Sequence, residues 1–238
     1  MKIALIGYGK MGKMIEQIAI SRGHEITFRI DIDNAADMDK LSPSNCDVAI
    51  EFTTPHTAFD NVTRCLNRGV SVVCGSTGWA AQLPEAQKIA NEKGVALLWA
   101  SNFSIGVNLF FKINQHLAKL MNGVEGYEPA MTEIHHIHKK DAPSGTAITL
   151  AEGLLDNYKK KKVWKLAPDG GENSLVIIAE RTGEVPGTHI VKYDSPVDYI
   201  EITHCTKNRQ GLAFGAVLAT EFVNGKKGIF SMDDLLKF

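Results

Sequence analysis

The 238 residues of the chain suit one large domain or two small ones. Lysine and arginine total 26 against 27 aspartates and glutamates, and this net charge of −1 excludes a protein whose main task is to hold nucleic acid by charge. Hydrophobic residues make up 44% of the chain, which excludes global disorder, yet no apolar run approaches the ~20 residues that a membrane span needs. We therefore expect neither a nucleic-acid nor a membrane partner.

Short apolar runs alternate with helical patterns in the first half of the chain. The pattern predicts strands at 2–6, 25–30, 47–52, 70–74 and 95–99, with helices at 11–21, 55–67 and 83–92. Strands that alternate with helices favour a parallel sheet covered on both faces. We therefore expect an α/β, Rossmann-like domain whose ligands bind at the carboxyl ends of its strands.

The pattern changes after residue 103. Helices are predicted at 105–121 and 147–158, and strands at 129–138, 174–181, 189–195 and 199–205, with no helix long enough to connect the last strands as parallel crossovers. This order indicates an inserted α+β domain with a mixed or antiparallel sheet. Helical spacing returns at 213–223 and 231–238, so we expect a first domain of residues 1–103 completed by 212–238, and a second domain of 104–211. The lysine run 159–162 is expected to be solvated.

The segment after the first strand matches the dinucleotide-binding pattern G-x-G-x-x-G, with Gly7, Gly9 and Gly12. Glycines at these positions permit a tight turn, close approach of a pyrophosphate, and close packing of the helix on the strand. Asp31 follows Gly12 by nineteen residues, near the spacing of a carboxylate that binds ribose hydroxyls. Because Asp31 and Asp33 would repel a 2′-phosphate, the sequence modestly favours NADH over NADPH.

Three of the eight histidines lie within four positions, at 135, 136 and 138. On a strand, His135 would face one side and the other two the opposite side. A zinc site is one interpretation, but the split faces and the lack of a nearby cysteine disfavour it, so no metal is expected. A purely structural histidine strand is another. Acid–base chemistry is favoured, since histidine titrates near neutral pH and a lysine such as Lys139 can donate a proton.

Ser144, Gly145 and Thr146 precede a predicted helix, so their backbone N–H groups are available to an anion. An ordinary helix cap is the simpler interpretation of the turn alone. With Lys139 five residues upstream, an anionic substrate is favoured. No G-x-S-x-G elbow supports a serine hydrolase, and Cys74 at a strand end is interpreted as a core residue rather than a nucleophile. The four scattered cysteines and the short apolar stretch before Gly7 lead us to expect a reducing, cytoplasmic setting.

The segment 133–146 resembles the signature E-x-H-H-x-x-K-x-D-x-P-S-G-T of the dihydrodipicolinate reductase family. Further segments resemble other motifs of that family in the same order: 7–12, 75–78, 100–108, 181–189 and 201–204. The resemblance implies NAD(P)H-dependent reduction of 4-hydroxy-tetrahydrodipicolinate, a small cyclic dicarboxylate, in diaminopimelate and lysine biosynthesis. It also implies a homotetramer assembled through the second domain.

The resemblance assigns roles to individual positions. His135 matches a proton donor or acceptor and Lys139 a proton donor. The implied substrate contacts are His136, Ser144, Gly145 and Thr146. The implied cofactor contacts are Gly7, Tyr8, Gly9, Lys10, Met11, Asp31, Gly75, Ser76, Thr77, Ala100, Ser101, Asn102 and Phe103. Two alternatives remain at this point: a related dehydrogenase that acts on an amino-acid semialdehyde with Cys74 as nucleophile, and a non-enzymatic dinucleotide sensor.

Overall fold

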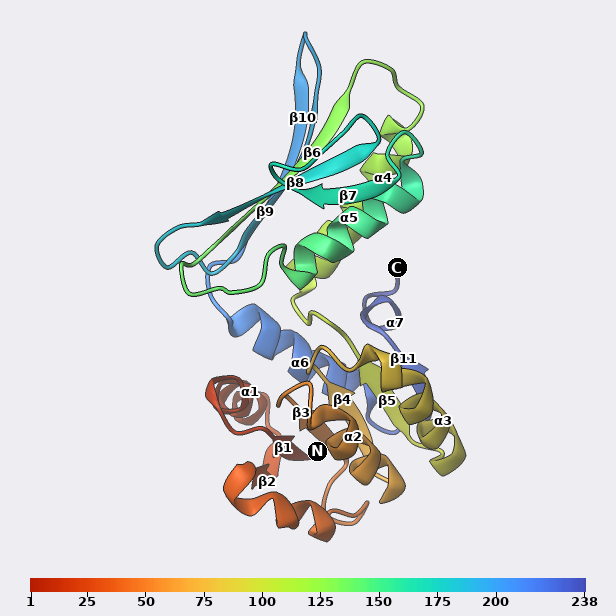
Figure 1. Cartoon of the computed structure of the whole chain (residues 1–238). Coiled ribbons are helices and arrows are strands. Elements are labelled where there is room, and N and C mark those ends of the chain that lie inside the picture. Colours follow the sequence, from red (N-terminus) through yellow and green to blue (C-terminus); the bar gives the residue numbers. More distant parts are fainter. The chain divides into compact units, whose positions relative to one another are not determined.

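Six strands, five from the first half of the chain and one from its end, form a single parallel sheet in the computed structural model, which describes residues 1–238 (Figure 1). They are β1 (Lys2–Ile6), β2 (Glu25–Ile30), β3 (Val48–Glu51), β4 (Ser71–Cys74), β5 (Ala96–Trp99) and β11 (Gly228–Phe230). Their order is β11-β5-β4-β3-β1-β2, and every neighbouring pair is parallel. The end of the chain therefore completes the sheet that its beginning starts.

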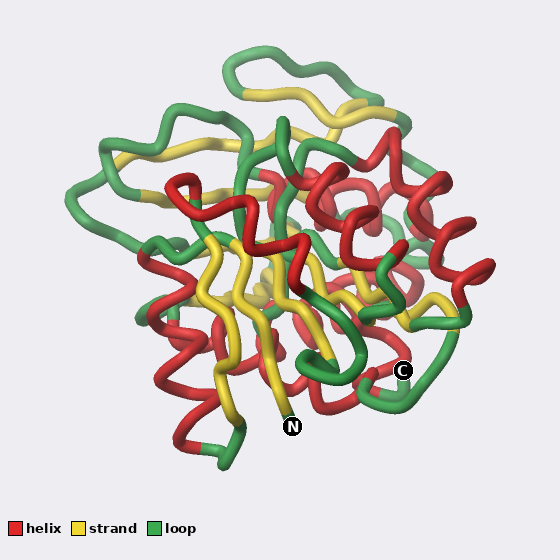
Figure 2. The backbone as a smooth tube through the Cα atoms, turned by 90° about the horizontal axis from the view of Figure 1, so that it is seen from below, coloured by secondary structure: helices red, strands yellow, loops and turns green.

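Helices cover both faces of this sheet (Figure 2). Helices α1 (Lys10–Ser21) and α6 (Gln210–Val223) pack on one face, while α2 (Ala58–Asn67) and α3 (Leu83–Lys93) pack on the other. Along β1, Ile3 and Leu5 enter the first core, whereas Ala4 and Ile6 enter the second. Both faces of the strand are buried, which is why the strands are continuous apolar runs rather than alternating ones. Short 3₁₀ segments at Ile32–Lys40 and Ala80–Gln82 and the helix α7 (Met232–Leu236) complete the unit.

A second sheet is mixed. Its strands are β6 (Glu128–His135), β7 (Val163–Leu166), β8 (Ser174–Arg181), β9 (Thr188–Asp194) and β10 (Tyr199–Cys205), in the order β10-β9-β6-β8-β7. Strand β8 runs parallel to β6 and β7, whereas β9 runs antiparallel to β6 and β10. Helices α4 (Ile105–Met121) and α5 (Gly145–Asn157) share one core with this sheet.

The predicted fold class is confirmed: a Rossmann-like parallel sheet with a second, mixed sheet. The chain divides into one unit of Met1–Ile105 with Gln210–Phe238 and another of Gly106–Arg209. None of the helices is both long and apolar enough to span a bilayer.

Several details differ from the sequence-based expectation. Strands β7 and β11 were not predicted, although β8, β9 and β10 follow one another without a helix, as expected. Strand β6 ends at His135, so His136 and His138 lie in the following turn rather than on the strand. In the lysine run, Lys161 is buried, and its Nζ lies 2.6 Å from Glu128 Oε2.

Candidate active site

The glycine loop after β1 is shaped by close backbone contacts. Gly7 has a positive φ of 91°, and a Cβ there would lie 2.0 Å from the Phe52 carbonyl oxygen. At Gly12 a Cβ would lie 2.3 Å from the Gly7 carbonyl oxygen, whereas at Gly9 it would meet nothing within 4 Å. Gly7 and Gly12 are therefore required by the fold, and Gly9 leaves open space where a ligand can approach the backbone.

The N-terminus of α1 is suited to a phosphate. Gly9 caps the helix without a side-chain hydrogen bond, and the first turn contains no acidic residue. The first N–H groups of a helix have no partner within the helix, and the helix dipole places partial positive charge there. Tyr8, Lys10 and Met11 lie at this loop and are exposed or half-buried. Together these features fit the pyrophosphate of a dinucleotide.

The loop after β4 is fixed from behind by two tryptophans. The indole Nε1 groups of Trp79 and Trp99 donate to the Ser76 carbonyl at 2.8 and 2.9 Å, and the Thr53 N–H donates to Ser76 Oγ at 2.7 Å. Ser76 is itself buried, so its polar atoms hold the loop, while Gly75 and Thr77 remain accessible.

The segment after β5 likewise contains both accessible residues and a buried one. Ala100 and Asn102 are half-buried and Ser101 is exposed, at the same edge of the sheet as Gly7 and Gly75. Phe103 is only 1% exposed and packs in the core. Of the predicted cofactor residues, Ser76 and Phe103 are therefore placed as supports.

Asp31 directly follows β2 and caps the 3₁₀ segment Ile32–Lys40, with its Oδ1 accepting the Ile32 N–H at 2.9 Å. Arg29, two residues earlier, donates through Nε to Glu16 Oε1 at 2.7 Å, and Tyr8 donates to the other oxygen of Glu16. Hydrogen bonds from Arg29 and Tyr8 hold the pKa of Glu16 below its usual range. The guanidinium of Arg29, close in sequence to Asp31, is thus already paired with a carboxylate of α1.

His135 occupies the end of β6 on the buried side of the second sheet, together with Glu133. Its Nδ1 has no hydrogen-bond partner and lies 3.4 Å from Glu133 Oε2. Burial lowers the pKa of His135; Glu133 opposes this, while the charges of Lys139 and Arg181 add to it. His135 is therefore neutral at pH 7, since a histidine pKa below about 6.5 leaves the base form dominant.

Lys139 lies in the loop that follows β6, and its Nζ contacts Asp141 Oδ1 and Oδ2 at 2.9 and 2.8 Å. Its side chain is 21% exposed and so only partly buried. His136, next to His135, is half-buried. The loop therefore presents the partly exposed ammonium of Lys139 close in sequence to the neutral imidazole of His135.

Ser144 begins α5 as its N-cap, with its Oγ accepting the Ala147 N–H at 3.2 Å. It is buried, and His189 Nε2 lies 3.1 Å from the same hydroxyl. Gly145 and Thr146 form the first turn, which contains no acidic residue. As at α1, this helix N-terminus favours an anion.

Glu133, His135 and His189 are the residue types that could hold a metal, and their ligand atoms lie within 4.8 Å of one another. The sequence did not predict this group, because His189 comes from a different strand. The Glu133 oxygens already accept from the Arg181 guanidinium and the Ser144 N–H, each at 3.0 Å. A metal cation at this carboxylate would have to displace a guanidinium, so the donor set fits an ion pair better than a metal site.

Cys74 is fully buried, and burial raises its pKa far above the usual range. Its Sγ lies 3.0 Å from Glu51 Oε2, which further disfavours a thiolate. A nucleophilic cysteine needs an accessible, electropositive environment. The geometry therefore does not support the semialdehyde chemistry that would use Cys74.

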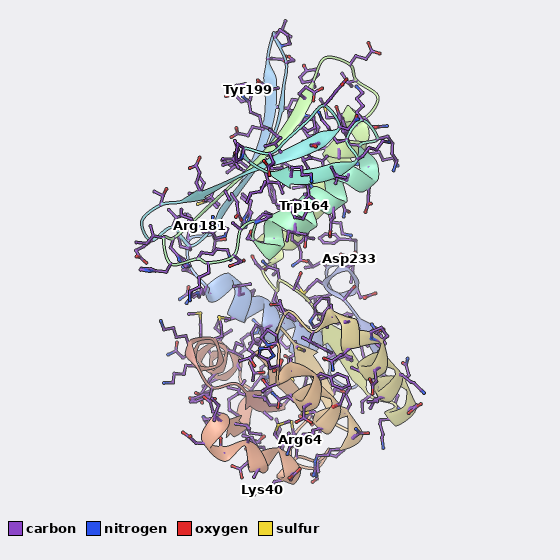
Figure 3. All side chains as sticks on the ribbon, in the orientation of Figure 1. Lys40, Arg64, Trp164, Arg181, Tyr199 and Asp233 are labelled. Atoms are coloured by element: carbon purple, nitrogen blue, oxygen red, sulfur yellow. The ribbon has the colours of Figure 1, made fainter.

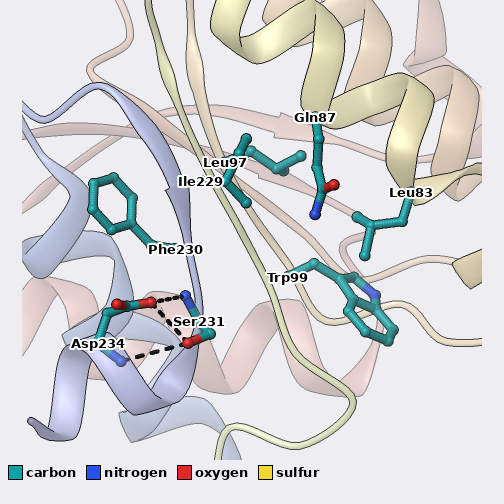
Figure 4. A pocket seen from close by; sticks show the side chains of 8 residues that line it. All are labelled: Leu83, Gln87, Leu97, Trp99, Ile229, Phe230, Ser231 and Asp234. Atoms are coloured by element: carbon teal, nitrogen blue, oxygen red, sulfur yellow. Dashed lines mark hydrogen bonds between the residues drawn. The ribbon is translucent and has the colours of Figure 1, made fainter.

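The first unit contains a pocket of about 330 Å³, and Trp99, which donates to Ser76, forms one of its walls (Figure 4). Its walls are largely apolar, and its polar side is formed by Gln87 and by the Ser231–Asp234 cap of α7. None of the residues predicted for the cofactor or the substrate lines it. This pocket is thus lined by residues other than those predicted for the chemistry.

Three residues at the site received no role from the sequence: Glu133, Arg181 and His189. Glu133 precedes His135 by two positions on a strand, so their shared face could have been deduced. Arg181 and His189 reach the site only through the strand pairing of β8 and β9 with β6, which the sequence did not reveal.

Two family models match the chain end to end. The model described as dihydrodipicolinate reductase, N-terminus, matches residues 1–103, and that described as dihydrodipicolinate reductase, C-terminus, matches residues 106–236. A 4-hydroxy-tetrahydrodipicolinate reductase of Christiangramia forsetii is 48% identical over 99% of this chain and 98% of its own. One of Methanocaldococcus jannaschii is 35% identical over 98% of this chain and 80% of its own.

Solved structures agree on the fold. A dipicolinate-bound dihydrodipicolinate reductase from Paenisporosarcina sp. TG-14 superposes with a TM-score of 0.80 at 22% identity, covering 97% of each chain. An aspartate semialdehyde dehydrogenase II from Vibrio cholerae reaches a TM-score of 0.53 at 11% identity, covering 93% of this chain and 97% of its own. The first comparison matches the architecture of both sheets, and the second shows that this two-part fold also serves a different reaction.

Proposed function

Because the chain belongs to the dihydrodipicolinate reductase family, we propose that its first unit binds the dinucleotide and its second unit binds and protonates the substrate. The chain is an NAD(P)H-dependent oxidoreductase that reduces 4-hydroxy-tetrahydrodipicolinate in diaminopimelate and lysine biosynthesis. The reaction consumes one NAD(P)H and one proton, and it releases tetrahydrodipicolinate, NAD(P)⁺ and water. The bound nicotinamide supplies the hydride.

The protein supplies the proton and the binding charge. We assign proton donation to the Lys139 ammonium, because it is accessible and because the neighbouring His135 is neutral at pH 7. Hydride arrival leaves negative charge on the conjugated imine, which a nearby cationic acid can neutralise. The observation that carries this assignment is the pairing of a partly exposed ammonium with a buried, neutral histidine in the segment that leads into the N-terminus of α5.

Two carboxylates on the substrate require two anion-binding groups. The first turn of α5, at Gly145 and Thr146, is one, and the His136 side chain with the Lys139 ammonium forms the other. Substrate carboxylate would then compete with Asp141 for the Lys139 ammonium. Loss of NADH oxidation on removing Lys139 or His135, with NADH binding intact, tests these roles.

We propose that NADH is preferred to NADPH. Asp31 follows β2, where a carboxylate in this type of fold binds the ribose and would repel a 2′-phosphate, and the side chain after it, Ile32, is 90% exposed and apolar. Arg29, two residues before Asp31 in the sequence, is held by Glu16. A 2′-phosphate would therefore meet a negative charge and no free arginine.

Glu16→Gln is expected to raise the affinity for NADPH relative to NADH by about tenfold, or about 1.4 kcal/mol, because it releases Arg29 to bind the 2′-phosphate. Fluorescence titration of both dinucleotides measures the ratio. The control is Glu25→Gln, which removes an exposed carboxylate at the start of β2, the strand that carries Arg29. An unchanged ratio in Glu16→Gln would refute the role of Glu16.

We propose a homotetramer assembled through the second unit. A groove of about 430 Å³ between α4 and β10 is lined mainly by apolar side chains, and three of these are strongly exposed: Ile113, Leu120 and Ile200. Strand β10 is also the edge of its sheet, and Tyr199 at its start is exposed (Figure 3). An apolar groove beside an unpaired edge strand supports burial against another copy of the chain.

Ile200→Glu is expected to shift the particle mass measured by light scattering from four chains to fewer, because it places a charge in the apolar groove. Ile20→Glu, an exposed isoleucine on α1 of the first unit, is the matched control. A single-chain mass for the unmodified protein would contradict the assembly.

We further propose a cytoplasmic location, which suits a biosynthetic enzyme with three buried free cysteines.

A further inference from the structure

An ion pair between a fully buried carboxylate and a partly buried arginine lies beside the proposed catalytic residues. Glu133 has no exposed surface, and its Oε1 accepts from Arg181 Nη2 at 3.0 Å. The strand register creates this pair: His135 is the neighbour of Arg181 across β6 and β8, and Glu133 is the neighbour of His189 across β6 and β9. Residues of three strands therefore meet at one end of the sheet.

The second oxygen of Glu133 connects the proposed acid–base residue to the anion-binding turn. Glu133 Oε2 accepts the Ser144 N–H at 3.0 Å and lies 3.4 Å from His135 Nδ1. His189 Nε2 lies 3.9 Å from the same oxygen and 3.1 Å from the Ser144 hydroxyl. One carboxylate thus sets the distance between His135 and the start of α5.

Arg181 in turn holds the loop that carries Lys139. Its Nη2 also donates to the Asp141 carbonyl at 2.6 Å, and its Nε donates to the Lys139 carbonyl at 3.3 Å. These contacts fix the backbone that carries the Lys139 ammonium. A guanidinium can reach all three acceptors at once because its donors form a rigid, planar fork.

We propose that Glu133 and Arg181 are a positioning pair for the reductase reaction: together they hold His135, the Lys139 loop and the Ser144–Thr146 turn in one geometry. This inference rests on the roles proposed above for His135 and Lys139. A buried ion pair is costly to desolvate and gives little net stability, so its value here lies in geometry. Neither residue donates a proton to the substrate.

The carboxylate also acts on the charge state of His135. The charged or titratable groups that face this histidine are Glu133 on its own strand, Lys139 and Asp141 on the loop, Arg181 on β8 and His189 on β9. Of these, Glu133 and Asp141 raise the pKa of His135, against burial and the two cations. Burial lowers the pKa of His189 to about 4, so His189 stays neutral at pH 7.

The test compares two carboxylates of the same strand. Glu133→Gln is expected to lower kcat/KM by about 10²-fold through misplacement of the reacting groups, with NADH affinity unchanged. It should also move the acidic limb of the kcat/KM profile to lower pH, because loss of the charge lowers the pKa of His135 further. Glu128→Gln, which breaks the pair with Lys161 at the other end of β6, is the control and should move neither quantity.

Arg181→Lys supplies a second, independent readout that keeps the positive charge beside Glu133. It is expected to lower kcat at least tenfold, because an ammonium cannot hold Glu133 and the two loop carbonyls together. Wild-type kcat in Arg181→Lys, or an unmoved acidic limb and wild-type kcat/KM in Glu133→Gln, would overturn the proposal. Full turnover in His135→Gln and Lys139→Ala would instead refute the proposed function, so the two failures are distinguishable.

Discussion

Lys139→Ala is expected to lower kcat by about 10²–10⁴-fold, the range of effect of a lost general acid. The Lys139 ammonium is held in place by Asp141, and the neighbouring imidazole of His135 is neutral at pH 7 and cannot replace it as a donor. Because the residue lies in the second unit, NADH binding by the first unit should be unchanged. Stopped-flow turnover and a separate NADH titration measure the two quantities.

Lys140→Ala is the matched control for this variant. The two lysines are adjacent, but Lys140 is exposed, whereas Lys139 is held against Asp141. Lys140→Ala should retain turnover within a factor of about two, since a surface charge contributes little. Equal losses in both variants would mean that general charge near the site, and not a positioned acid, explains the effect.

Gly12→Ala is expected to weaken NADH binding at least tenfold and to destabilise the protein by about 1–3 kcal/mol, the usual cost of an overpacked position. The added methyl group would lie 2.3 Å from the Gly7 carbonyl oxygen, so either the loop or α1 must shift. Such a shift would move the helix N-terminus away from the pyrophosphate. Thermal unfolding and NADH titration measure the two effects.

Gly9→Ala tests whether the dinucleotide occupies space that the protein itself leaves empty. A Cβ at Gly9 meets no protein atom within 4 Å, so the melting temperature of the Gly9→Ala variant should stay close to that of the unmodified protein. Its NADH affinity should nevertheless fall, because the methyl group occupies the space in front of the helix N-terminus. If Gly9→Ala bound NADH normally, the dinucleotide would not lie over this loop.

The first sheet was largely predictable, because its strands are apolar runs between recognisable helices. The two missed strands are short: β7 has four residues and β11 has three. Neither carries a periodic signal of its own, and β11 exists because β5 offers it an unpaired edge. Lys161 was expected in solvent, but Glu128 from a distant strand supplies the partner that permits its burial.

The site was predictable where it is local in sequence. His135, Lys139 and Ser144 lie within ten residues, between the end of β6 and the start of α5 at Gly145. Arg181 and His189 were not predictable, since only the register of three strands brings them to Glu133. Ser76 and Phe103 lie in the expected cofactor loops but point into the protein, and the sequence contains no signal for that direction.

Steady-state oxidation of NADH and NADPH by the unmodified protein tests the central claim most directly. The substrate is made in the cuvette from pyruvate and aspartate semialdehyde by the enzyme that condenses them. We predict that oxidation requires both precursors and is faster with NADH, because Asp31 and the Glu16-bound Arg29 disfavour a 2′-phosphate. Folded protein that binds NADH but oxidises neither cofactor under these conditions would contradict the account.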